Sequence, residues 1–442
     1  MIIKPLLSLT ALFVAFSATA SDLKINLKVE RFVLANGLTV LLHEDHSIPS
    51  VSYHTWYRVG SKEEKEGVTG AAHMLEHMMF KGAKKYGLQD FDRLMHENGI
   101  SHNAFTTNDY TGFYQNLPPD KLELVMDIEV DRMSALTLNS EELLRERDVV
   151  KEERRWRIDN NPSGVLREAT MSTVFQVHPY RWPVIGTMKD ISDYNAEKLR
   201  YFYETFYVPN NAVLVIAGDI DVSKTKELVK KYYSSLPAKK MSPPPYEKEP
   251  TQKTARTTTK EADVQSVTMN ISYQGVAQGH DDMYALDLLS GILGEGSSSR
   301  IYKNLVQAKG LATSAFAYHM SLKDHGLFSV GMTLKPGADS KVATDLVLNE
   351  IYRIRTKGIQ SEELKKAKIQ VMGGIVDGLQ TIDSKARALA ASEIVTGSYE
   401  TLFSDIEKYN QVTLQDIQRV ALKYLNSEMK STVTLVPKVG RK

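Results

Sequence analysis

Runs of apolar, β-branched and aromatic residues predict short strands in both halves of the chain. Glycine, proline and asparagine flank these runs, and Asn36-Gly37 is a dipeptide typical of a tight β-hairpin. The predicted strands cover residues 30–43 as a hairpin, 51–59, 102–117 as a strand or hairpin, 211–219, 267–273, 325–334 and 431–436.

Apolar residues that recur every three or four positions predict helices between these strands. Gly99 is expected to close one helix, and Asn139 or Ser140 to cap the start of another. The predicted helices cover residues 67–80, 88–98, 120–135, 140–158, a segment ending at 235, 283–293 and 361–379. Strands and helices therefore alternate along the chain.

A proline cluster at residues 237–246 interrupts this pattern, which then restarts. The chain has 442 residues, more than the usual size of one domain. We therefore predict a linker at 237–250 that joins a domain at 21–236 to a domain at 251–442. Because the pattern of strands and helices repeats, the second domain is predicted to be a diverged copy of the first.

The composition is that of an ordinary globular protein, with 42% hydrophobic and 25% charged residues. Lys and Arg number 55 against 54 Asp and Glu, so nothing points to a nucleic-acid partner or a polybasic membrane surface. The chain has no cysteine, which excludes disulfides and thiolate metal ligands. Any metal must be bound by histidines and carboxylates.

The first twenty residues have the three parts of a secretory signal peptide. Lys4 is positive, residues 6–16 are mostly apolar, and Ala18-Thr19-Ala20 is a small-residue cleavage site. We predict cleavage between Ala20 and Ser21, because the apolar run is shorter than the roughly 20 residues that span a bilayer. The expected location is periplasmic or secreted, and the lack of cysteine favours the periplasm.

The sequence His73-Met-Leu-Glu76-His77 lies in a predicted helix. Histidines four residues apart lie on one helical face and can share a zinc ion. A carboxylate at Glu76 can reach a water molecule at the metal and act as a general base. The alternative is a pair of histidines without function in an amphipathic helix. In the second copy the aligned residues, 289–293, are Leu-Ser-Gly-Ile-Leu, which carry no metal-type side chain.

Two glutamates in the predicted helix at 140–158 offer a further ligand. Glu146 and Glu153 are seven residues apart and lie on the same face of that helix. A third protein ligand would leave one position for water, as catalytic zinc requires. The alternative is a solvated helix with salt bridges, since ten of the fourteen residues from Glu141 to Arg154 are charged.

These motifs together resemble the M16 (pitrilysin) family of zinc peptidases with an inverted HxxEH motif. Glu153 follows His77 by 76 residues, and Glu146 falls at the family's accessory position. The resemblance extends over most of the chain and is closest to the short subfamily that includes mitochondrial processing peptidase subunits and bacterial homologues. Further matching segments are GAAHMLEHMMFKG (70–82), NAFTTNDYT (103–111), FYVPNNA (206–212) with AGD (217–219), and GSSSRI (296–301).

The resemblance implies an α+β fold of two homologous αβ domains, each a mostly antiparallel sheet covered by helices, which together form half of a clam-shell. It also implies one Zn²⁺ per chain, bound by His73, His77 and Glu153. Glu76 would activate the water and Glu146 would support the site. Asn103 and Ala104 match the edge strand on which the family aligns a peptide substrate by strand addition.

One departure from the family is the absence of an arginine and a tyrosine seven residues apart, whose positions here are Val306 and Thr313. Arg300, Tyr302 and Tyr318 are nearby but lack the required spacing. The resemblance therefore implies a heterodimer in which a homologous partner supplies this pair.

We predict a zinc-dependent endopeptidase that hydrolyses unfolded peptides or oligopeptides and is the zinc-bearing subunit of this heterodimer. A second hypothesis is a non-cleaving M16-like subunit that binds peptides or assembles with partners. A third, an unrelated metal hydrolase of small molecules, is disfavoured by the edge-strand segment at 103–111.

Overall fold

The computed structural model describes residues 27–243 and 245–438, so the predicted signal peptide and its cleavage site lie outside the described residues. The first of two sheets has the strand order β1-β2-β6-β3-β5-β4. All its pairs are antiparallel except β2 with β6. Its strands are β1 (Glu30–Val33), β2 (Thr39–Glu44), β3 (Val51–Tyr57), β4 (Ser101–Thr106), β5 (Thr111–Leu117) and β6 (Ala212–Gly218).

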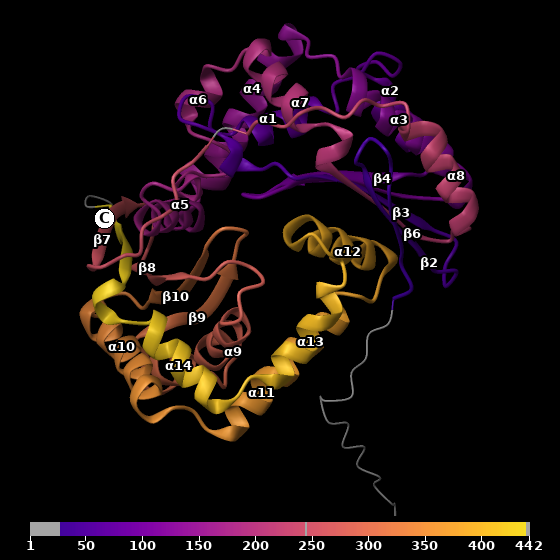
Figure 1. Cartoon of the computed structure of the whole chain (residues 1–442). Helices are drawn as coiled ribbons and strands as arrows, with labels where there is room; N and C mark the ends of the chain where they lie inside the picture. Colours follow the sequence, from indigo (N-terminus) through magenta and orange to yellow (C-terminus); the bar gives the residue numbers. More distant parts are fainter. Residues whose placement is uncertain (1–26, 244, 439–442) are drawn as a thin grey trace, which may run out of the picture.

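Helices cover one face of this first sheet (Figure 1). Apolar residues of the helices, such as Leu75, and of that face of the strands, such as Tyr53 and Phe113, form a large buried core. The helices are α1 (Ala71–Met78), α2 (Asp90–Glu97), α3 (Leu122–Ala135), α4 (Ser140–Arg154), α6 (Met188–Ser192), α7 (Ala196–Phe206) and α8 (Val222–Tyr233).

The second sheet has the order β7-β11-β8-β10-β9, and only β7 with β11 is parallel. Its strands are β7 (Arg256–Ala262), β8 (Thr268–Gly275), β9 (Ala312–Ser321), β10 (Gly326–Leu334) and β11 (Ser431–Pro437). Its core is enclosed by the helices α9 (Met283–Gly294), α10 (Ser340–Lys357), α11 (Ser361–Asp377) and α14 (Leu414–Tyr424). Helix α13 (Thr401–Gln411) packs against α9. The predicted α+β fold with two mostly antiparallel, helix-covered sheets is confirmed.

Each sheet is also covered by a helix from the other half of the chain (Figure 1). Helix α12 (Ile382–Thr396) packs against β3 and β6 of the first sheet, where it buries Trp56. Helix α5 (Pro162–Val174) packs against β7, β8 and β11 of the second sheet. Neither helix was predicted from the sequence, and neither was its packing against the sheet of the other half. Among the described residues, no helix combines the length and apolarity needed to cross a bilayer.

Local sequence signals place most elements where they were expected. The hairpin of β1 and β2 turns at Gly37, which has a φ of 85°. The segment 102–117 is a hairpin of β4 and β5, and Asn139 caps α4 by accepting hydrogen bonds from two backbone amides. The predicted helix at 140–158 differs in its last turn, because residues Arg155–Asp159 form a π-helical turn. Residues 237–243 and 245–250, in the predicted linker, contain no helix or strand.

Candidate metal centre

Helix α1 is fixed at its N-terminus by a glycine and a buried glutamate. Gly70 has a φ of 87°, and a Cβ there would lie 2.3 Å from the carbonyl oxygen of Ile185. The Glu64 carboxylate accepts hydrogen bonds from the amides of Gly70 (2.6 Å) and Ala72 (2.9 Å). This carboxylate satisfies amides that the first turn of a helix leaves without partners. The start of α1 is thus held against the segment at 185–186.

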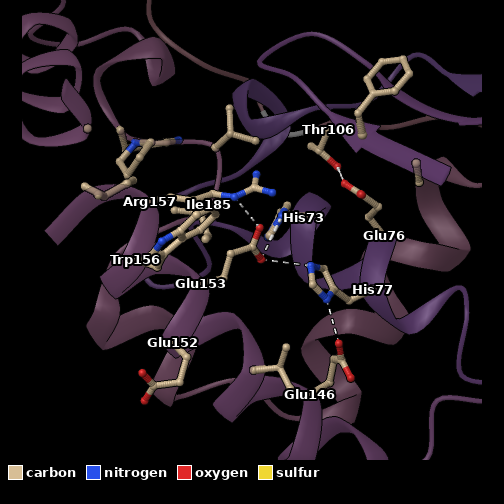
Figure 2. Close-up of a pocket in the computed structure, with 18 of the residues that line it drawn as sticks. His73, Glu76, His77, Thr106, Glu146, Glu152, Glu153, Trp156, Arg157 and Ile185 are labelled. Carbon is tan, nitrogen blue, oxygen red and sulfur yellow. Dashed lines mark hydrogen bonds and ion pairs between the residues drawn. The ribbon is translucent and has the colours of Figure 1, made fainter. Parts of the chain in front are cut away.

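His73 and His77 of α1 face Glu153 of α4 (Figure 2). The Oε2 atom of Glu153 lies 3.7 Å from Nε2 of His73 and 3.3 Å from Nε2 of His77. One ligand atom from each of these three residues lies within 4.8 Å of the other two. The structure therefore brings together the three residues that the sequence selected as metal ligands.

The chemistry of this group fits a zinc ion. Two imidazoles and one carboxylate are a common donor set of catalytic zinc, with a fourth position left for water. The Oε2 atom of Glu153 is buried, and no described residue donates a hydrogen bond to it. A buried carboxylate oxygen without a hydrogen-bond donor is costly, and a cation between it and the two imidazoles would remove that cost.

The protonation of this group follows from burial and from the neighbouring carboxylates. Burial, with a smaller effect of His77, lowers the pKa of His73 to about 4, so its imidazole is neutral near pH 7. Burial also acts to lower the pKa of His77, but the carboxylate of Glu146, to which it is hydrogen-bonded, and the nearby carboxylate of Glu153 outweigh burial and raise the pKa to about 9. Burial acts to raise the pKa of Glu153, but the neighbouring His77, His73 and Arg157 outweigh burial and lower it. The two carboxylates therefore favour a positive charge at this group.

Glu146 orients His77 from the side opposite Glu153. Its Oε1 lies 2.7 Å from Nδ1 of His77, and its Oε2 lies 2.7 Å from Nζ of Lys81. A hydrogen bond to the second ring nitrogen fixes the tautomer and direction of a metal-binding histidine. On the other side, Arg157 places its Nε 2.9 Å from Oε1 of Glu153. Glu146 is therefore outside the converging group and in contact with one of its members.

Glu76 lies apart from the three converging residues. Its carboxylate is buried and accepts a hydrogen bond from the hydroxyl of Thr106 in β4 (Figure 2). Burial raises its pKa, against the effect of that hydrogen bond. A carboxylate whose pKa is raised toward neutrality can take and return a proton.

A cavity of about 900 Å³ contains these side chains. Every described residue that lines it lies between residues 73 and 185, and Asn103 and Ala104 of β4 are among them. Within the described residues β4 pairs with β5 alone and ends the strand order, so its outer edge is open for another strand. The candidate metal group and the predicted substrate strand therefore share one cavity.

Lys81, Thr106, Trp156 and Arg157 are among the cavity residues that were not predicted from the sequence. Lys81 and Arg157 follow His77 and Glu153 by four residues, a spacing that places each pair on one helical face and could have indicated the contact. Thr106 contacts Glu76 only because β4 packs beside α1, for which the sequence has no local signal. Trp156 lies in the π-helical turn, with 74% of its surface exposed.

The two positions of the missing arginine and tyrosine lie in the second half of the chain. Val306 packs against the second core, and Thr313 in β9 donates a hydrogen bond to the carbonyl of Thr333. The nearby Arg300 forms two hydrogen bonds with Glu363, at 2.7 and 2.6 Å. Arg300 is thus paired with a carboxylate of its own half of the chain.

An HxxEH helix and a distant glutamate on a two-sheet α+β scaffold define the class of zinc peptidases with the inverted motif. Two family models match the chain, one described as Insulinase (Peptidase family M16) over residues 39–188 and one as Peptidase M16 inactive domain over residues 193–371. The chain is 33% identical to the zinc protease PqqE of Helicobacter pylori over 414 residues, 93% of each chain. The protein belongs to peptidase family M16 and is a homologue of zinc proteases.

Other relatives agree with this assignment. The uncharacterized zinc protease YmxG of Bacillus subtilis is 27% identical over 399 residues, 89% of this chain and 95% of that protein. The crystal structure of a protease from Helicobacter pylori matches with a TM-score of 0.88 and 32% identity, over 93% of this chain and 100% of that one. The first half of the periplasmic protease PqqL from Escherichia coli has the same fold, with a TM-score of 0.78 at 20% identity over 94% of both chains.

Proposed function

We propose that this chain is a zinc-dependent endopeptidase that hydrolyses unfolded peptides or oligopeptides. The observation that carries the proposal is the single cavity that holds His73, His77 and Glu153 beside Glu76 and the open edge of β4. A folded protein could not place its backbone along that edge, whereas an extended peptide could add to it as a further strand.

Each side chain in the cavity has a proposed role. His73, His77 and Glu153 hold one zinc ion, and Glu146 keeps the imidazole of His77 in position. When bound, zinc supplies Lewis-acid polarisation of the scissile carbonyl and lowers the pKa of the attacking water. Glu76 takes the proton from that water and returns it to the leaving amine.

Asn103 and Ala104 align the substrate backbone along β4. Strand addition gives affinity through backbone hydrogen bonds, so it accepts many sequences. The amide of Ala104 donates to the side chain of Asn103 at 2.8 Å, a contact that an added peptide strand could replace.

The proposal extends to a partner and a location. Because every described residue lining the cavity precedes residue 186, and Arg300 is paired with Glu363, a homologous subunit is proposed to supply the arginine and tyrosine. The predicted signal peptide supports a periplasmic location. A non-cleaving subunit that binds peptides is the alternative, which the absence of the arginine and tyrosine favours.

The test is hydrolysis of an unstructured peptide by the zinc-loaded chain, alone and with a candidate homologous partner. We expect Glu76→Gln to bind zinc as the wild type does and to lower the cleavage rate at least about 100-fold, the usual size of a lost general base. Cleavage only with the partner would support the heterodimer. Cleavage by the chain alone would contradict it, and cleavage under neither condition would favour the alternative.

A further inference from the structure

The strand β4 is contacted from behind by a helix of the second half of the chain. Helix α12 packs on the face of the first sheet that is opposite to α1 (Figure 1). Its Arg387 guanidinium lies 5.1 Å from the ring centre of Phe105 in β4 and 4.6 Å from that of Tyr114 in β5. A cation over two aromatic faces attracts both of them. Arg387 thus joins the edge strand to its neighbour and to α12.

Phe105 occupies a defined place in β4, between the residues that face the site. Ala104 precedes it in the proposed substrate strand, and Thr106 follows it and donates a hydrogen bond to Glu76. The Phe105 ring meets Trp56 edge-to-face at 5.0 Å and covers Gly112, where a Cβ would lie 2.6 Å from the ring. A displacement of Phe105 would therefore move Ala104 and Thr106 relative to the metal centre.

The turn after β4 is held by the second half as well. Asp109 accepts a hydrogen bond from the amide of Lys323 in the second half at 3.0 Å, and one from the hydroxyl of Tyr180 in the first half at 2.5 Å. Buried Lys62 lies 3.2 Å from carboxylate oxygens of both Asp109 and Asp324. The far end of the β4–β5 hairpin is thus anchored, and Arg387 is a contact of the second half with the strand itself.

We propose that Arg387 is a positioning residue, which fixes β4 and the peptide aligned on it at the correct distance from the metal centre. The proposal rests on the proposed peptidase function and gives the half of the chain without metal ligands a part in substrate alignment. Asp383, one helical turn earlier, holds the guanidinium with an oxygen at 3.6 Å. Arg387 itself does not line the cavity, so it acts through Phe105, which does.

The test compares Arg387→Leu with Lys385→Met in the full-length chain, assayed under whichever condition supports cleavage. Lys385 is a matched control on the same helix, because it also contacts the first half, at Asp45 (2.6 Å), but not β4. We expect Arg387→Leu to raise KM about threefold to tenfold, the range of one cation–π contact, with zinc affinity unchanged. Arg387→Lys, which keeps a cation over the rings, should restore most of the affinity.

Hydrogen exchange of the amides at 101–106 gives a readout that needs no substrate. Arg387→Leu should speed exchange in β4, and Lys385→Met should not. Equal KM values and equal β4 exchange in the two variants would overturn the proposal, since Arg387 would then only help to hold α12. If the wild type cleaves no peptide, the proposed function fails, and the exchange of β4 alone decides whether Arg387 positions the strand.

Discussion

A single carboxylate oxygen, Oε2 of Glu153, is the point at which the metal centre can be tested most directly. It is buried, faces both imidazoles, and receives no hydrogen bond from any described residue. Its neighbour Glu152 also lines the cavity, but it lies away from the two imidazoles, exposed to solvent and paired with Arg155 (Figure 2). Two adjacent glutamates in one helix therefore have opposite surroundings.

We expect Glu153→Gln to weaken zinc binding more than about 100-fold, beyond the loss typical of contacts outside the ligand set. The amide keeps the shape of the side chain but loses the anionic ligand. Glu152→Gln is the control and should bind zinc as the wild type does. The measurement is a competition titration with a zinc chelator; equal affinities for the two variants would remove Glu153 from the ligand set.

The sequence selected the three side chains that converge at the candidate metal centre, but not the contacts around them. Spacing alone placed His73 and His77 on one face, and the family resemblance supplied Glu153. The contact of Thr106 with Glu76 depends on how β4 lies against α1, which is a tertiary feature. Its prediction would need the packing of the sheet as well as the sequence.

At the scale of single elements, the position of α1 depends on its close contact with the segment at 185–186. Gly70 and Gly67 have almost the same backbone φ, 87° and 88°, but differ in surroundings. A Cβ at Gly70 would meet the backbone of Ile185, whereas a Cβ at Gly67 has no described atom within 4 Å. A comparison of alanine substitutions at these two glycines therefore separates the cost of backbone strain from the cost of the steric contact.

Gly70→Ala should therefore lower the free energy of unfolding more than Gly67→Ala. Both variants carry the left-handed strain of about 1–2 kcal/mol, and overpacking adds about 1–3 kcal/mol at Gly70 alone. Urea denaturation of the two proteins measures the difference, and zinc affinity should fall only for Gly70→Ala because α1 carries two of the proposed ligands. The same stability for both variants would show that the close contact does not hold α1.

Local patterns predicted elements better than they predicted partners between elements. The hairpin of β1 and β2 and the helix α4 were expected from turn and capping residues, and they are present. Helix α12 has apolar residues at helical spacing from Ile382 to Ile394, but such spacing does not specify which sheet they cover. The π-helical turn after α4 was missed because its sequence also fits an α-helix.

At the scale of the whole molecule, the ion pair between Asp45 and Lys385 joins the two halves and predicts a pH dependence of stability. Hydrogen bonds from Lys385 and Ser47 hold the pKa of Asp45 well below its usual range in the folded protein. A carboxyl with a lowered pKa stabilises the fold above its ordinary value of about 4, and that stabilisation is lost as the pH falls further.

Asp45→Asn should be less stable than the wild type at pH 7, by about 1 kcal/mol or less, as for other partly exposed ion pairs. The difference should shrink below pH 4, because Asp45 is then protonated in the unfolded chain, whereas the ion pair keeps it ionised in the folded protein. Urea denaturation at pH 7 and pH 3 measures it. Asp345→Asn, which removes the exposed pair with Lys341, is the control and should differ little from the wild type in stability at either pH. A stability difference between Asp45→Asn and the wild type that does not change with pH would contradict the lowered pKa of Asp45.

The domain boundaries at 236 and 251 stay a prediction. Because α5 and α12 each pack on the sheet of the opposite half, a division of the chain at these boundaries would uncover both sheets. If the chain were cut at 237–250, the first fragment would expose Trp56, Val213 and Val215, which α12 covers in the intact chain. The second fragment would lose α5 from Val433 and Leu435 of its sheet. The two halves are therefore not independent folding units, and a substitution that loosens α12 in the second half would also uncover the sheet beneath the candidate metal centre.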